Sequence, residues 1–129
     1  MSCVVANVKV AHLRAGTPAY DNVAEWLADD ARNAYVGRQV RVFITGSDGT
    51  KRRFVVPESP FANQFKAQEH GVARCIELYG AWLAERVAHD AAFRAALLAL
   101  RGKVLGCWCA PAPCHAQVLC DYLNGVKLD

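Results

Sequence analysis

The sequence predicts one small α/β domain of the Rossmann-like type, with two or three layers, in which helices pack on a mixed sheet that includes a β-hairpin. Short apolar runs rich in β-branched residues alternate with segments whose apolar residues recur at helical spacing. Two strand-like runs flank a Ser-Asp-Gly turn, as in a hairpin. The 129 residues, 53% of them hydrophobic, suffice for one core, so we assign residues 1–129 to a single domain.

The first half of the chain is predicted to contain a strand, a helix, a second strand and the hairpin. β-branched residues from Cys3 to Val10 indicate an opening strand. Thr17-Pro18 is typical of a helix entrance, and apolar residues then recur at helical spacing up to Asn33. Residues 34–38 indicate a short strand. Residues 39–56 alternate apolar and polar side chains around the turn and form the predicted hairpin.

The second half is predicted to be mostly helical, with one further strand. Pro57–Lys66 is a loop by its prolines, but two phenylalanines and Asn63 indicate more than a simple connector. An apolar stripe from Val72 to Val87 predicts a long helix, and a shorter helix begins at Asp90. Lys103–Trp108 is apolar and bounded by glycine and prolines, which indicates a buried central strand.

The stretch Arg101–Gly125 contains four of the six cysteines, and its second part predicts the last helix. Pro113 suits the first position of this helix, so Cys114 and His115 are expected in its first turn. The N–H groups of a first turn lack helical partners, and the helix dipole places partial positive charge there. A thiolate is favoured in that position, so we expect a lowered pKa for Cys114.

These residues predict a ligand site at the carboxyl ends of the strands. Cys114 is a candidate catalytic nucleophile, and His115, expected to point inward and to be neutral, is a candidate base. The candidate substrate-binding residues are Asn7, Arg38, Asn63 and Cys109. Arginine and helix N–H groups suit a phosphate, and asparagine with aromatic rings suits a base, so the expected ligand is a nucleotide or related phosphorylated metabolite.

The sequence permits both an enzyme and a binding protein at such a site. With Cys114 as nucleophile and His115 as base, it would support a hydrolase or transferase acting on a nucleotide. No Asp or Glu lies within the motif to orient the histidine. A non-catalytic protein that binds or sequesters the same ligand needs the pocket alone, and is the first alternative.

Metal binding is a second alternative for the same residues. Cys107 and Cys109 project to one face of a strand, and Cys114 with His115 would complete a zinc-binding set. The C-x-C spacing departs from the usual zinc knuckle, so we expect no metal and no other cofactor. A C-x-C pair is also a poor disulfide, and we expect reduced thiols.

The charge of the chain permits an anionic ligand without indicating a dedicated nucleic-acid binder, because the net charge is only +3. A basic ribbon on the hairpin makes a nucleic-acid-binding module the third alternative. Its members are Arg41, Lys51, Arg52 and Arg53. The first residues show no signal-peptide pattern and no apolar run is long enough to cross a bilayer, so we expect a cytoplasmic protein without membrane contact.

Four stretches of the chain carry a family resemblance. They are V-V-A-N-V at Val4–Val8, Y-V-G-R at Tyr35–Arg38, S-P-F-A-N-Q-F at Ser59–Phe65, and L-R-G-K-V-L-G-C-W-C-A-P-A-P-C-H at Leu100–His115. With them the sequence resembles the domain-of-unknown-function family 4326 (DUF4326), small proteins of bacteria and bacteriophages. Gln64 stands where the family pattern has proline. The resemblance implies a shared site built from these motifs and leaves its chemistry open. The order strand, Cys, Pro, Cys-His, helix also resembles family 488, which favours a Rossmann-like layout.

Overall fold

The computed structural model describes residues 3–46, 48–109 and 114–125. Strands and helices both occur throughout these ranges, as expected of an α/β fold. Their order is β1 (Val4–Asn7), α1 (Val10–Ala15), α2 (Val23–Ala28), β2 (Asn33–Tyr35), β3 (Val40–Thr45), β4 (Lys51–Val56), α3 (Ala67–His70), α4 (Val72–His89), α5 (Ala91–Leu98), β5 (Val104–Cys107) and α6 (His115–Gly125). The predicted fold class, with helices packed on strands, is confirmed.

The strands form two sheets. A parallel sheet has the order β1-β5-β2, and the antiparallel hairpin β3-β4 forms a second sheet, so the parallel and antiparallel parts are separate where a single mixed sheet was expected. The prediction of a central strand after Gly102 is confirmed in β5. Asn7 pairs with Cys107 and Tyr35 with Gly106. All three strands therefore end at the same edge of the sheet.

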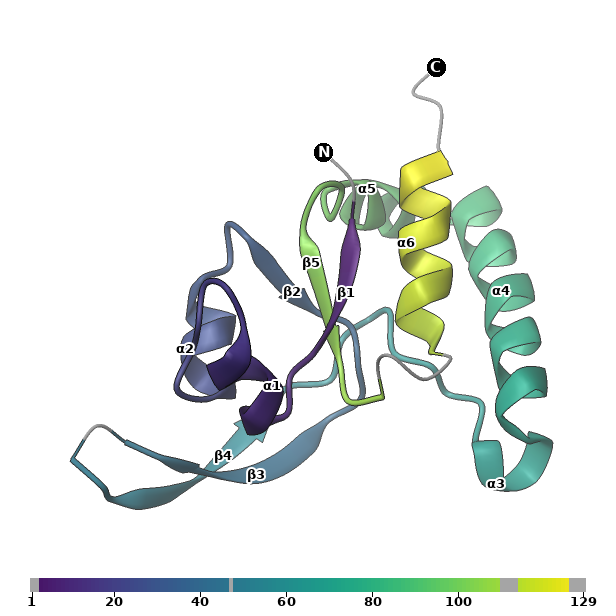
Figure 1. Cartoon of the computed structure of the whole chain (residues 1–129). Coiled ribbons are helices and arrows are strands. Elements are labelled where there is room, and N and C mark those ends of the chain that lie inside the picture. Colours follow the sequence, from purple (N-terminus) through teal and green to yellow (C-terminus); the bar gives the residue numbers. More distant parts are fainter. Residues whose placement is uncertain (1–2, 47, 110–113, 126–129) are drawn as a thin grey trace.

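Helices cover both faces of the parallel sheet and make three layers. Figure 1 shows α4, α5 and α6 on one side and α1 and α2 on the other, with the hairpin extending away from the sheet. The alternation of side chains along β5 accounts for this arrangement. Leu105 and Cys107 are buried in the core beneath α4–α6, whereas Val104 packs with the core beneath α2 and the hairpin.

The close approach of α2 to the sheet depends on a glycine in β5. A Cβ atom added at Gly106 would collide with the indole of Trp26 and lie 2.8 Å from Cγ1 of Val8. Trp26 and Val8 are both buried. The missing side chain at Gly106 therefore lets Trp26 lie directly against the central strand.

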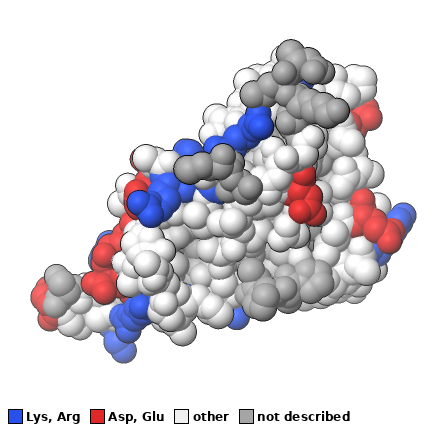
Figure 2. Space-filling view, turned by 45° about the horizontal axis from the view of Figure 1, so that its top comes forward, with Lys and Arg blue, Asp and Glu red and all other residues white. Residues whose placement is uncertain are grey.

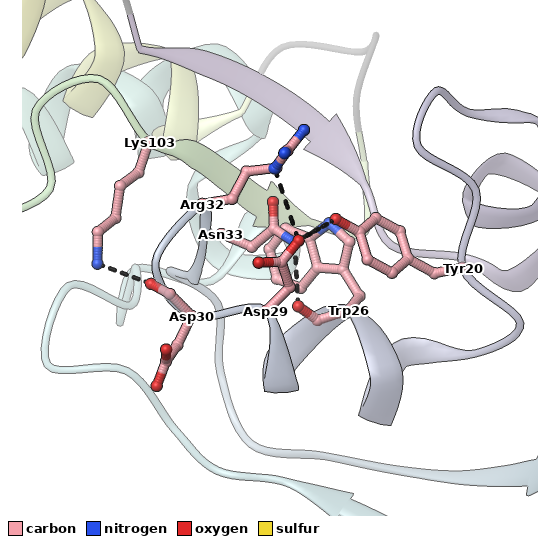
Figure 3. A network of polar contacts seen from close by, with 7 residues as sticks. All are labelled: Tyr20, Trp26, Asp29, Asp30, Arg32, Asn33 and Lys103. Carbon is pink, nitrogen blue, oxygen red and sulfur yellow. Dashed lines mark hydrogen bonds and ion pairs between the residues drawn. The ribbon is translucent and has the colours of Figure 1, made fainter.

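The junction between α2 and β2 is a polar network that ends the helix earlier than predicted (Figure 3). The buried Asn33 donates from Nδ2 to the Trp26 carbonyl (3.0 Å) and to the Tyr20 hydroxyl (3.1 Å). The same hydroxyl donates to Oδ2 of Asp29 at 2.7 Å. Because Asn33 binds a carbonyl of the last helical turn, α2 ends at Ala28 and Asn33 begins β2.

Asparagine also explains the early end of the first strand. The prediction of a strand from Cys3 to Val10 is wrong beyond Asn7, because Oδ1 of Asn7 accepts the N–H of Lys9 (2.9 Å) and turns the chain. Helix α1 then begins at Val10, where the sequence predicted no helix. The strand expected over residues 34–38 is shorter as well, since Gly37 and Arg38 leave the sheet.

The helix entrance predicted at Thr17-Pro18 is wrong, because α2 begins at Val23, after Oδ1 of Asn22 accepts the Glu25 N–H (3.0 Å). The other predicted elements are confirmed. The hairpin spans β3 and β4, although Ser47 of its turn lies outside the described residues. Helix α4 matches the apolar stripe, and Oδ1 of Asp90 accepts the N–H of Phe93 (2.9 Å) to begin α5. Helix α6 is tied to the first strand by Asn124, whose side chain accepts from the Cys3 N–H (2.7 Å) and donates to the Cys3 carbonyl (3.1 Å).

We predict that Gly106→Ala lowers the free energy of unfolding by about 1–3 kcal/mol, because the new methyl group overpacks the contact with Trp26 and Val8. Urea denaturation measures this change. The matched control is Gly80→Ala in α4, where the nearest atom to the added Cβ is Cγ1 of Val118 at 4.0 Å. There, alanine should raise stability by about 0.5–1 kcal/mol through its helix propensity. Equal stability of Gly106→Ala and the wild type would contradict this account of the α2 contact.

Candidate functional site

A pocket of about 430 Å³ lies beside the carboxyl edge of the parallel sheet. This volume is within the usual range for small-molecule sites. Its walls come from the chain after β2, the end of β5, the loop before α3, the start of α4 and the start of α6. Five of the six predicted site residues line it: Arg38, Asn63, Cys109, Cys114 and His115. The pocket thus brings together residues from three of the four sequence stretches that carry the family resemblance.

Asn7 is the predicted site residue that is not among those lining this pocket. Its Oδ1 accepts the Lys9 N–H, and its Nδ2 donates to the Trp108 carbonyl at 3.4 Å. Asn7 therefore joins the ends of β1 and β5 and supports the edge of the sheet next to the pocket.

His115, the first residue of α6, is held by a hydrogen bond to the chain that follows β2. Its Nε2 lies 2.6 Å from the carbonyl oxygen of Val36. A carbonyl only accepts, so Nε2 carries the proton and Nδ1 is the unprotonated nitrogen. The Tyr79 ring packs edge-on against the imidazole at 5.1 Å. Burial lowers the pKa of His115, against the opposing effect of the Val36 carbonyl, so the ring is neutral and points inward as predicted.

Cys114 immediately precedes α6 and is 5% exposed. Its carbonyl accepts the N–H of Gln117 (3.0 Å), and its Sγ lies 3.6 Å from Nδ1 of His115. Contacts with the thiols of Cys107 and Cys109, together with burial, raise the pKa of Cys114, and the Ala116 N–H opposes them only in part. The predicted lowering of this pKa is therefore wrong. Pro113, the predicted first helical residue, lies outside the described residues.

Three sulfur atoms cluster at one wall of the pocket. The Sγ atoms of Cys107, Cys109 and Cys114 all lie within 4.8 Å of one another, and the first two are 3.9 Å apart. Cys107 and Cys114 are buried, whereas Cys109 is exposed. His115 is not a member of this group, so three of the four residues named for the zinc alternative come together. Three convergent thiols can bind a soft metal ion.

Arg38 and Asn63 shape the loop on the opposite wall. Arg38 donates from Nε to the Asn63 carbonyl (2.6 Å) and from Nη2 to the Phe65 carbonyl (3.0 Å). Oδ1 of Asn63 accepts the Phe65 N–H at 2.9 Å. These bonds use two of the five N–H groups of the guanidinium, and they fix the loop against the end of β2.

Sequence reasoning missed two aromatic residues of the pocket, Tyr35 and Trp108. Nε1 of Trp108 donates to the Tyr35 hydroxyl (2.8 Å), which donates to the Arg38 carbonyl (2.6 Å). Burial raises the pKa of Tyr35, so the hydroxyl stays protonated and keeps its hydrogen bond to the Arg38 carbonyl. Both residues lie at the carboxyl end of a strand, and that position was the signal that could have identified them.

The basic residues of the hairpin are divided between its two faces. The register pairs Arg53 with Phe43 and Arg52 with Ile44, so neighbouring side chains alternate between faces. One face carries Arg41, Phe43, Lys51 and Arg53, with Phe43 78% exposed. Arg52 lies on the other face, where its guanidinium is 5.6 Å from the Phe54 ring. Figure 2 shows charged side chains of both signs on the face drawn, with Lys and Arg side chains following one another across its upper left part.

Comparison with known proteins identifies the family of the chain. The family model DUF4326, described as a domain of unknown function, matches residues 23–125. No curated protein and no solved structure matches significantly. Within the described residues, no helix is long and apolar enough to span a membrane. The matched segment includes three of the four stretches that carried the resemblance and covers most of the 129 residues, so the chain belongs to the DUF4326 family.

Proposed function

We propose that the protein binds a nucleotide or a related phosphorylated metabolite in the pocket at the edge of the parallel sheet. The observation that carries the proposal is the meeting of Arg38, His115 and the aromatic pair Tyr35 and Trp108 around one pocket of about 430 Å³. Open α/β sheets bind ligands outside the carboxyl ends of their strands, and this pocket has that position.

The walls of the pocket suit a flat ring. Tyr35, Phe65 and Trp108 contribute aromatic side chains, and Val40, Val72 and Ile76 are aliphatic. The hydrogen bond between Trp108 and Tyr35 fixes both rings before a ligand arrives, which lowers the entropy cost of binding. A nucleobase stacked on such rings would be held mainly by apolar contact.

Arg38 suits the charged part of the same ligand. Its guanidinium is exposed and keeps three N–H donors beyond its two bonds to the loop. No residue in the described lining of the pocket is Asp or Glu, so no carboxylate of the pocket wall competes with an anion. The guanidinium can therefore hold a phosphate with its remaining N–H groups, while Nε and Nη2 stay bonded to the loop.

Catalysis by Cys114 and His115 is a second candidate, and the orientation of the imidazole favours it. The Val36 carbonyl supplies the orienting partner that the sequence lacked, and it leaves Nδ1 as a base facing Sγ of Cys114. The raised pKa of Cys114 disfavours the thiolate form that a nucleophile needs. We therefore favour binding without turnover.

Calorimetry with Arg38→Gln tests the contact with phosphate. We expect nucleoside monophosphates to bind the wild type, and Arg38→Gln to weaken this binding at least about tenfold, or about 1.4 kcal/mol, by loss of the charged contact. The matched nucleosides lack the phosphate and should lose less than about threefold, which separates the ionic contact from any change in the loop. Arg101→Gln, an exposed arginine outside the pocket lining, is the control. Failure of every nucleotide to bind the wild type would refute the proposed function.

Phosphorus NMR of nucleotides incubated with the wild-type protein distinguishes a binder from an enzyme. We expect the spectra to remain those of the unchanged nucleotides at stoichiometric protein concentration, since Cys114 is buried and its burial and neighbouring thiols raise its pKa. Conversion that disappears in Cys114→Ser would instead establish the catalytic candidate.

A further inference from the structure

We propose that Cys107, Cys109 and Cys114 bind one zinc ion as thiolates and leave its fourth coordination position open toward the pocket. This inference does not depend on nucleotide binding. It rests on the positions of the three sulfur atoms, on the elements that hold them, and on the side from which they are accessible.

The distances between the sulfur atoms fit zinc coordination. Zinc binds cysteine sulfur at about 2.3 Å in tetrahedral geometry, which places two sulfur ligands about 3.8 Å apart. The Cys107 and Cys109 sulfurs are 3.9 Å apart. The Cys114 sulfur lies within 4.8 Å of both, so a shift of about 1 Å would complete the three-sulfur face of a tetrahedron.

Two separate elements hold these sulfurs in place. Cys107 ends β5 and is paired with Asn7, and its carbonyl accepts the Val8 N–H at 2.9 Å. Cys114 is fixed by the first turn of α6, where its carbonyl accepts the Gln117 N–H. The unusual C-x-C spacing is therefore no obstacle. Cys107 ends the strand, Cys109 follows it two residues later, and the start of the helix brings Cys114 to them, so no zinc knuckle is required.

The charge of the zinc-loaded site is small and is compensated by neighbouring groups. On binding, three S–H protons pass to solvent and three Zn–S bonds form, so the site carries a net charge of −1. The Ala116 N–H donates to Sγ of Cys114 and would stabilise the remaining negative charge. Arg38 lines the same pocket and adds a positive charge to it.

The fourth position faces the pocket. All three cysteines line it, and Cys109 is exposed, so an ion can enter from that side. The Nε2 of His115 is bound to the Val36 carbonyl. Its Nδ1 lies 3.6 Å from Sγ of Cys114, but the imidazole does not belong to the group of mutually close ligand atoms. A site with three protein ligands keeps one position for water or for a ligand atom, as catalytic zinc sites do.

Metal titration of the reduced, chelator-treated protein tests this site. We expect one equivalent of Zn²⁺ to bind in competition with a chromophoric chelator, and one equivalent of Co²⁺ to give thiolate-to-cobalt charge-transfer absorption. Cys109→Ser removes an exposed ligand without disturbing the core and should weaken binding at least about 100-fold. Cys75→Ser is the matched control, because Cys75 lines the same pocket but is not part of the sulfur cluster.

The open fourth coordination position is tested by a separate measurement. Adding a small external thiol to the cobalt-loaded protein, kept reduced by a phosphine, should change the cobalt spectrum as the thiol takes the fourth position. An unchanged spectrum would refute the open position. Less than half an equivalent of metal bound to the wild type, or equal affinity in Cys109→Ser, would overturn the zinc site itself, whatever the result with nucleotides.

Discussion

The site depends first on the hydrogen bond between Nε2 of His115 and the Val36 carbonyl. It joins the start of α6 to the chain that leaves β2, and so it fixes the distance between two walls of the pocket. It also selects the tautomer, which directs the unprotonated Nδ1 toward Cys114. Because Tyr79 of α4 packs against the same ring, the long helix reinforces this geometry. One half-buried imidazole therefore connects the fold to the geometry of the pocket.

The sequence predicted those elements whose structure follows from apolar periodicity. Regular stripes of apolar side chains are buried by helices α4 and α5, the hairpin and the central strand β5. The spacing of such stripes can be recognised in the amino-acid sequence. The short elements β1, α2 and β2 are limited by side-chain hydrogen bonds instead. Asn33 reaches a carbonyl seven residues away, and Asn7 turns the chain after β1. Local composition does not reveal which amide will make such a bond.

The sequence was sufficient to choose most residues of the candidate site, but not to predict the contacts and pKa values that result from their surroundings. The rule that ligands bind at the carboxyl ends of parallel strands was sufficient to select Cys109, Cys114 and His115. The pKa of Cys114 could not be obtained in this way, because the helix terminus lowers it while two neighbouring thiols and burial raise it, and only the structure gives the distances that decide the balance. Tyr35 and Trp108 were overlooked because aromatic residues in strands usually belong to the core.

Nitrogen-15 NMR of the imidazole of His115 is the most direct test of this account. The two ring nitrogens have different chemical shifts when one is protonated, so the tautomer can be assigned without a ligand or a metal. We predict a neutral ring at pH 7 with the proton on Nε2, bonded to the Val36 carbonyl. A proton on Nδ1, or a doubly protonated ring at that pH, would contradict the geometry from which the pocket is built.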